Sequence, residues 1–122
     1  MNMKKQKLFN SFVNACNGFL HFLAYDRNGK IHFVAAILVS FSGFYFKVSL
    51  NEWYILMICF AIVISFEMCN HALEKLSDAV QATHHPLIKT VKDVAAAAVL
   101  WSAIISAVIG LLIFVPKIAA II

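Results

Sequence analysis

Four polar residues that could do chemistry together follow directly after a long uncharged run. They are Glu67, Asn70, Glu74 and Asp78, here called the polar stripe. On a helix of about 3.6 residues per turn, this spacing keeps the four side chains within roughly a sixth of the circumference. Exposing a row of carboxylates to hydrocarbon is costly, so the stripe must face protein, water or lipid headgroups.

These carboxylates and a nearby lysine are the groups that phosphoryl transfer needs. Acidic oxygens can hold Mg²⁺, a lysine can meet phosphate oxygens, and a further carboxylate can act as a general base. Catalysis of this reaction is mostly charge neutralisation and alignment. Lys92 and Asp93, which open a later apolar segment, would complete such a site. The chain contains neither a Walker A sequence nor a glycine-rich phosphate loop, so spacing alone indicates only an acidic site.

Simpler interpretations stay open for several of these residues. Glu74 and Asp78 could be the solvated end of a long helix, and Glu67 could pair with Lys92 only to hold helices together. For Glu67 with Asn70 a functional role is favoured, because ionisable residues inside membrane segments usually have one.

Two further residues also have ordinary structural explanations. Asp26, in "YDRNGKIH", reads on its own as a helix-end or turn residue. Asp93 could suit the dipole at a helix start, and Lys92 could extend its ammonium group towards water.

The elements that position these residues are expected to be membrane helices. Of the 122 residues, 62% are hydrophobic and 13% are charged, which is outside the range of soluble globular proteins. Three helices, near residues 31–48, 53–80 and 90–115, contain enough apolar residues to span a bilayer. In residues 5–26 the apolar side chains fall on one helix face and the polar ones on the opposite face, which is typical of an amphipathic helix in the membrane interface. We therefore expect an all-α integral membrane protein with one domain over residues 1–122.

The connections and charges predict a topology. The short "KVSLNE" makes the first two spans an antiparallel hairpin, and Pro86 should stop the second helix by about Gln81. Lysine and arginine gather before the first span and around the second loop, which places the N-terminus in the cytoplasm. All acidic residues except Glu52 then lie at the cytoplasmic face.

The net charge of +4 does not indicate nucleic acid, because the basic residues are scattered around apolar segments. Anionic lipid headgroups are the expected partner. Three cysteines without a CxxC pair indicate neither a disulfide framework nor a zinc site.

The motif E-x-x-N-x-A-x-E-x-x-x-D, followed by "HPLIKTVKDVAAAAVL", resembles the prokaryotic diacylglycerol kinase family, which includes undecaprenol kinases. The resemblance runs from about residue 7 to residue 114. It implies a single membrane kinase domain in the bacterial inner membrane that uses ATP and Mg²⁺ to phosphorylate a membrane lipid alcohol. The segment "RNGKIHFVAAI" looks more like the branch in which undecaprenol, rather than diacylglycerol, is a frequent acceptor. Family members are homotrimers with active sites shared between subunits.

The same resemblance implies roles for the polar stripe. Glu67 matches the general base that takes the proton from the lipid hydroxyl, and Asn70 matches a polar residue next to the transferred phosphate. Glu74 matches a metal ligand. Asp26 stands where the family usually has the other metal-binding glutamate, and its shorter side chain changes the metal geometry.

The nucleotide side is implied in the same way. Lys92 and Asp93 match the pair that contacts ATP, while Thr83, His84 and His85 occupy loop positions that approach the nucleotide. Lys7 stands where some members have an arginine that contacts ATP, and a lysine does not reproduce the two-pronged guanidinium contact.

Two other protein classes compete with a kinase. A small proton-coupled multidrug-type transporter could use one intramembrane glutamate as its proton and substrate site. Such proteins usually place that glutamate nearer the membrane centre and lack the loop with its acid and lysine pair. A non-catalytic membrane assembly factor would explain the apolar helices but not the alignment of Glu67, Asn70 and Glu74.

Overall fold

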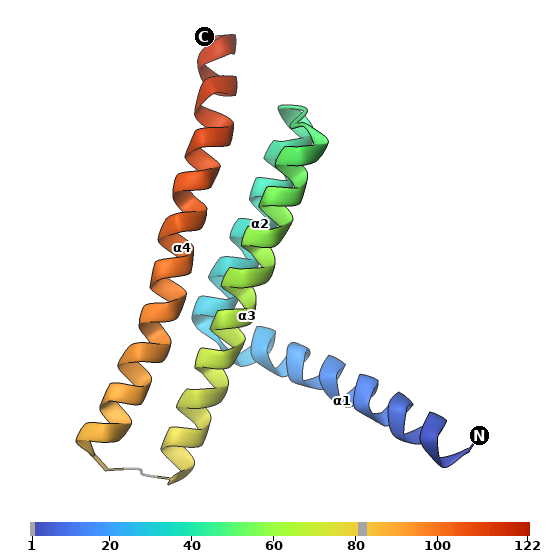
Figure 1. The fold of residues 1–122 in the computed structure, drawn as a ribbon, viewed down its shortest axis with the longest axis vertical. Coiled ribbons are helices and arrows are strands. Elements are labelled where there is room, and N and C mark those ends of the chain that lie inside the picture. Colours follow the sequence, from blue (N-terminus) through green and yellow to red (C-terminus); the bar gives the residue numbers. More distant parts are fainter. Residues whose placement is uncertain (1, 81–82) are drawn as a thin grey trace.

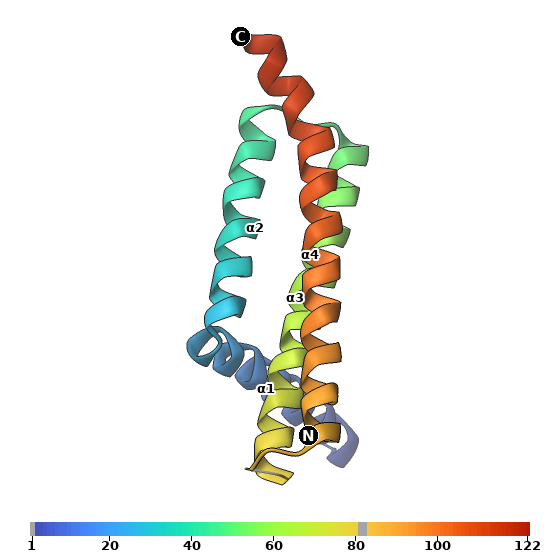
Figure 2. The same cartoon turned by 90° about the vertical axis from the view of Figure 1, so that its left-hand side faces the viewer.

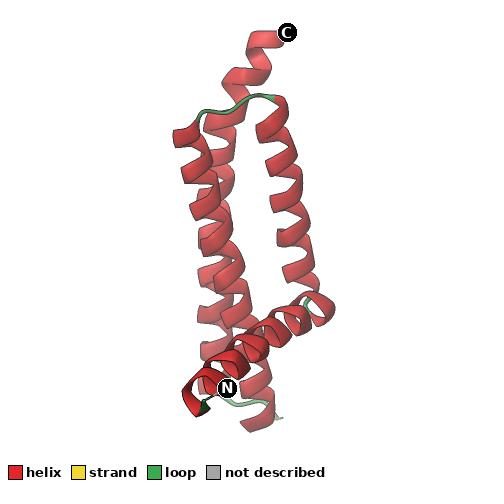
Figure 3. Ribbon diagram, turned by 90° about the vertical axis from the view of Figure 1, so that its right-hand side faces the viewer, coloured by secondary structure: helices red, strands yellow, loops and turns green. Residues whose placement is uncertain are grey.

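Helices make up nearly all of the computed structural model, which describes residues 2–80 and 83–122. They are α1 (Met3–Tyr25), α2 (Arg27–Tyr45), α3 (Leu50–Val80) and α4 (Pro86–Ile121). No strand occurs within the described ranges, and Figure 3 shows helices joined by short loops. The predicted all-α class is confirmed. α2, α3 and α4 run alongside one another, while α1 leaves them at an angle near the point where α2 begins (Figure 1).

α3 is the central helix, because it packs against α4 over much of its length and against α2 on another side. No close backbone contact joins α2 to α4 in the described part of the chain, and Figure 2 shows α2 on one side of the pair that α3 and α4 form. The buried residues of α3 recur every three, four or seven positions: Leu56, Cys59, Val63, Glu67, Asn70 and Ser77. The buried residues nearer the start of α3 are apolar (Leu56, Cys59 and Val63), and those nearer its end are polar (Glu67, Asn70 and Ser77).

Most of the large apolar side chains point outwards. α3 and α4 are long and apolar enough to cross a bilayer, yet only 28% and 17% of their most apolar windows are buried inside the protein. A core helix of a soluble protein would be mostly buried, so these faces suit lipid. α2 does not pass the same test of length and composition, since Arg27, Asn28 and Lys30 fill its first turn. Its predicted role as a third span stays a prediction.

Helix ends follow local hydrogen bonding. Ser49 and Glu52 form a capping box at the start of α3: the Glu52 N–H donates to Ser49 Oγ (3.2 Å), and the Ser49 N–H donates to Glu52 Oε1 (2.9 Å). Glu52 also pairs with Lys117 of α4, at 3.1 Å. This pair ties α3 to α4 at the end far from the polar stripe.

The expected helix bounds differ from the observed ones most in α2 and α4. α2 begins at Arg27 rather than near residue 31, and it ends at Tyr45 rather than near residue 48. α3 is described to Val80, and the predicted stop at Gln81 lies outside the described residues. α4 begins at Pro86 rather than near residue 90, because proline has the backbone angle and the missing N–H that suit the first helical position. It also continues beyond residue 115, through Pro116, to Ile121.

A single residue, Asp26, separates α1 from α2. The turn is tight because Phe22 of α1 is 3% exposed and its ring lies against Gly29 of α2. A Cβ atom added to Gly29 would overlap that ring. Glycine at residue 29 therefore allows the two helices to approach closely next to Asp26.

Replacing Gly29 by alanine should destabilise the protein by about 1–3 kcal/mol, because the added methyl group overpacks a buried contact. We expect a lower thermal unfolding midpoint in detergent micelles, measured by circular dichroism. Gly18→Ala is the matched control, since nothing lies within 4 Å of the added atom. Alanine is the better helix former, so this control should be neutral or stabilising. Equal effects at the two positions would contradict the packing argument.

Candidate active site

Asp26 occupies the break between α1 and α2, which confirms the prediction that it ends the first helix. An aspartate that precedes a helix usually accepts a hydrogen bond from one of the first backbone N–H groups. Asp26 makes no such capping bond. Its carboxyl group instead interacts with that of Glu67 on α3. The break between α1 and α2 thus brings an acidic side chain to the polar stripe.

Glu67 is the most deeply buried large side chain of the described residues, with 2% of its surface exposed. The expectation that the stripe does not face hydrocarbon is confirmed for this member. Its carboxyl group interacts with Asp26 and Asn70 and lies within electrostatic range of Glu74. Carboxyl groups packed together in this way repel one another unless a proton or a cation lies between them.

Asn70 links Glu67 to the next turn of the stripe. Its side-chain amide donates to Glu74 Oε1 at 3.5 Å, and the residue is 6% exposed. Two buried oxygen atoms next to Glu67, Asp26 Oδ2 and Asn70 Oδ1, have no hydrogen-bond donor. Buried acceptors without a donor are rare in proteins, so these atoms call for a proton donor or a cation.

The donor atoms are of the kind that Mg²⁺ prefers, since they are carboxylate and amide oxygens. Among residues 2–80 and 83–122, no three histidine, cysteine, aspartate or glutamate side chains converge on one point. Mg²⁺ in nucleotide sites needs only one or two protein carboxylates, with phosphate oxygens and waters as the other ligands. Asp26 and Glu74, which both interact with Glu67, are therefore compatible with a metal that arrives with a nucleotide.

Lys92 of α4 lies next to the end of the polar stripe that carries Glu74 and Asp78. Its Nζ atom is 2.7 Å from Asp78 Oδ1, and the ammonium group is also within electrostatic range of Glu74. The interpretation in which Glu67 pairs with Lys92 is not what the structure shows, because Asp78 is the partner. Asp93 pairs with Lys89 one turn earlier on α4, at 2.6 Å. Both residues of the expected nucleotide pair thus have counter-ions within the chain.

The remaining candidate residues lie in the segment directly before α4 or on α1. His85 precedes α4 and accepts a hydrogen bond from the Leu87 N–H on Nδ1 (3.2 Å). Thr83 and His84 are exposed in the same loop. Lys7 lies near the N-terminal end of α1, which points away from the other helices (Figure 1). The structure therefore brings Asp26, the stripe and Lys92 together, and it leaves Lys7 apart from them.

Sequence reasoning missed both counter-ions. The pairing of Lys89 with Asp93 could have been found, since residues four apart on a helix are neighbours. The pairing of Asp78 with Lys92 joins two helices across a loop, and no local pattern indicates it.

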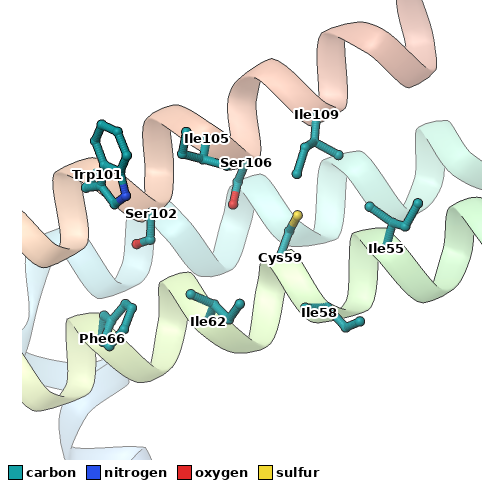
Figure 4. Close-up of a pocket in the computed structure, with 10 residues that line it drawn as sticks. All are labelled: Ile55, Ile58, Cys59, Ile62, Phe66, Trp101, Ser102, Ile105, Ser106 and Ile109. Atoms are coloured by element: carbon teal, nitrogen blue, oxygen red, sulfur yellow. The ribbon is translucent and has the colours of Figure 1, made fainter.

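Two apolar grooves lie between the helices. One groove of about 400 Å³ runs between α3 and α4, from Phe66 and Trp101 at one end to Ile55 and Ile109 at the other (Figure 4). Phe66 directly precedes Glu67 in the chain. A second groove of about 390 Å³ lies between α2 and α4, over α3. Both grooves have mostly apolar walls, which suit a hydrocarbon chain whose polar end reaches the level of Glu67.

Comparison with known proteins agrees with this geometry. The sequence profile of the family described as "Prokaryotic diacylglycerol kinase" matches residues 13–114, a range that includes every candidate residue except Lys7. The chain is also 41% identical over 111 residues to a protein named undecaprenol kinase from Bacillus subtilis (strain 168), covering 91% of this chain and 90% of that relative. The chain therefore belongs to the prokaryotic diacylglycerol kinase family and is a membrane lipid kinase.

Proposed function

We propose that this protein transfers the γ-phosphate of ATP to the hydroxyl group of undecaprenol, with diacylglycerol as the second candidate acceptor. The observation that carries the proposal is the burial of Glu67 next to Asp26 and Asn70, in a protein that also has apolar grooves between its helices. Similarity to a protein named undecaprenol kinase supports the order of the two acceptors.

Glu67 acts as the general base in the proposed reaction. It takes the proton from the lipid hydroxyl as that oxygen bonds to the γ-phosphorus, and the bond from this phosphorus to the bridging oxygen of ADP breaks. Burial suits this role, because it keeps competing water away from the reacting oxygen. Asn70 holds Glu74 and lies next to the phosphate that moves.

Asp26 and Glu74 hold Mg²⁺ in this proposal, and the ion would offset the charge of the phosphate oxygens when bound. Lys92 meets phosphate oxygens as a point charge. Asp93 contacts the nucleotide, as do the loop residues Thr83, His84 and His85. The side chain of Asp26 is one methylene shorter than the glutamate that the family usually has. Because Asp26 directly follows α1, the backbone at the end of that helix determines how far the carboxylate reaches.

The protein is proposed to work as a homotrimer in the bacterial inner membrane. α2, α3 and α4 would each span the bilayer, with the N-terminus in the cytoplasm and α1 in the interface near anionic headgroups. Glu74 and Asp78 are exposed in the single chain, and the N-terminal end of α1, which carries Lys7, points away from the other helices (Figure 1). A neighbouring subunit could cover the exposed carboxylates and supply Lys7, which would make the active sites shared. The comparisons support a lipid kinase and give no support to the transporter alternative.

Glu67→Gln should lower the rate of phosphate transfer at least about 100-fold, because an amide cannot accept the proton. Transfer of label from γ-labelled ATP would be measured in mixed micelles that contain undecaprenol or diacylglycerol, side by side. Glu52→Gln is the control, since Glu52 lies at the other end of α3 and should leave the rate unchanged. If wild-type protein labelled neither alcohol, the proposed function would be wrong.

Asp26→Asn should raise stability while removing activity, because an amide donates to Glu67 and ends the repulsion between two carboxyl groups. We expect a gain of about 1 kcal/mol in EDTA, seen as a higher thermal unfolding midpoint. Mg²⁺ with a non-hydrolysable ATP analogue should raise the midpoint of wild-type protein and have little effect on the variant. A wild-type midpoint that ignores Mg²⁺ and the analogue would count against this metal site.

A further inference from the structure

In the ion pair between Asp78 and Lys92, the carboxylate of Asp78 takes up the ammonium group that is proposed to bind ATP. It joins the last turn of α3 to the second turn of α4, with 2.7 Å between Nζ and Oδ1. A carboxylate at this distance lies where a phosphate oxygen would meet the same ammonium group. The negative charge of Asp78 also repels a triphosphate that approaches Lys92, even though the ammonium group has three donors.

Helix stability does not explain the position of Asp78. The last turn of a helix disfavours a negative charge, because the helix dipole is negative at that end. The pair is also exposed, with 65% of the Asp78 side chain and 38% of the Lys92 side chain accessible, and exposed ion pairs contribute little to folding. Lys89 shows the same conflict at the first turn of α4, where the dipole disfavours a positive charge, and it pairs with Asp93.

We propose that Asp78 sets the nucleotide affinity of the site by competing with the triphosphate for Lys92. The inference rests on the proposed function, in which Lys92 binds ATP. In the nucleotide-free protein Asp78 holds the lysine side chain next to Glu74, and ATP displaces the carboxylate when it binds. Asp78 competes with the phosphates of ADP in the same way, which favours release of the product.

The deciding measurement is the KM for ATP at saturating lipid alcohol, together with the Kd of a fluorescent ATP analogue. Asp78→Asn removes the charge and keeps the shape, so the KM for ATP, the Kd and the inhibition constant of ADP should each fall about two- to fivefold. Asp78→Glu keeps a carboxylate and should stay close to wild type. Because residue 78 is exposed, both variants should unfold at nearly the wild-type temperature.

Glu52→Gln is the matched control, because Glu52 and Lys117 form the other ion pair that joins α3 to α4. It should leave the KM and the Kd unchanged, which separates competition at the site from a general loosening of the helix pair. An Asp78→Asn variant with an unchanged or raised KM and Kd, in an active wild-type background, overturns this inference alone. A wild-type protein that binds no nucleotide and transfers no phosphate overturns the proposed function as well.

Discussion

Two acidic side chains packed against each other, Asp26 and Glu67, are the contact on which the rest of the site depends. Neither carboxyl group is in a position that favours folding on its own: Glu67 is buried, and Asp26 does not cap the helix that it precedes. Their approach requires the close contact of Phe22 with Gly29 and the burial of α3 by its neighbours. The fold therefore spends stability to gather negative charge at one level, which is the usual sign of a site that binds a cation or moves a proton.

The surfaces around Asp26 and Glu67 are largely apolar and exposed, because the chain builds only a small apolar core. A small apolar cluster forms around Val48, Leu56 and Ile113, near the end of the helices that carries the Glu52 and Lys117 pair. Elsewhere most of the large apolar side chains point outwards, and the grooves beside α4 have apolar walls. In a bilayer these surfaces would face hydrocarbon, so in the proposed reaction the lipid would approach Glu67 from the side, while the nucleotide would approach Lys92 from water.

Much of this arrangement could be predicted from the order of residues, and the reasons are local. The helical spacing of Glu67, Asn70 and Glu74 predicts one face, and the "KVSLNE" turn predicts the hairpin of α2 and α3. The start of α4 was missed because Pro86 was interpreted only as the residue that stops the preceding helix, whereas proline also suits the first position of the next one. The partner of Lys92 was also missed, since Asp78 comes close only after α3 and α4 have packed together. Long-range charge pairs of this kind depend on helix rotation and loop path, which no spacing rule reports.

The junction of α1 and α2 has a mechanical consequence. With one residue between them, the two helices share no linker that could absorb a change of angle. Any swing of α1 about that point must turn the backbone of Asp26 itself and carry its carboxyl group with it. Whatever holds α1 at its angle, whether lipid surface or neighbouring subunit, therefore also sets the gap between the two acids, and in that sense the surroundings of the protein are part of the proposed active site.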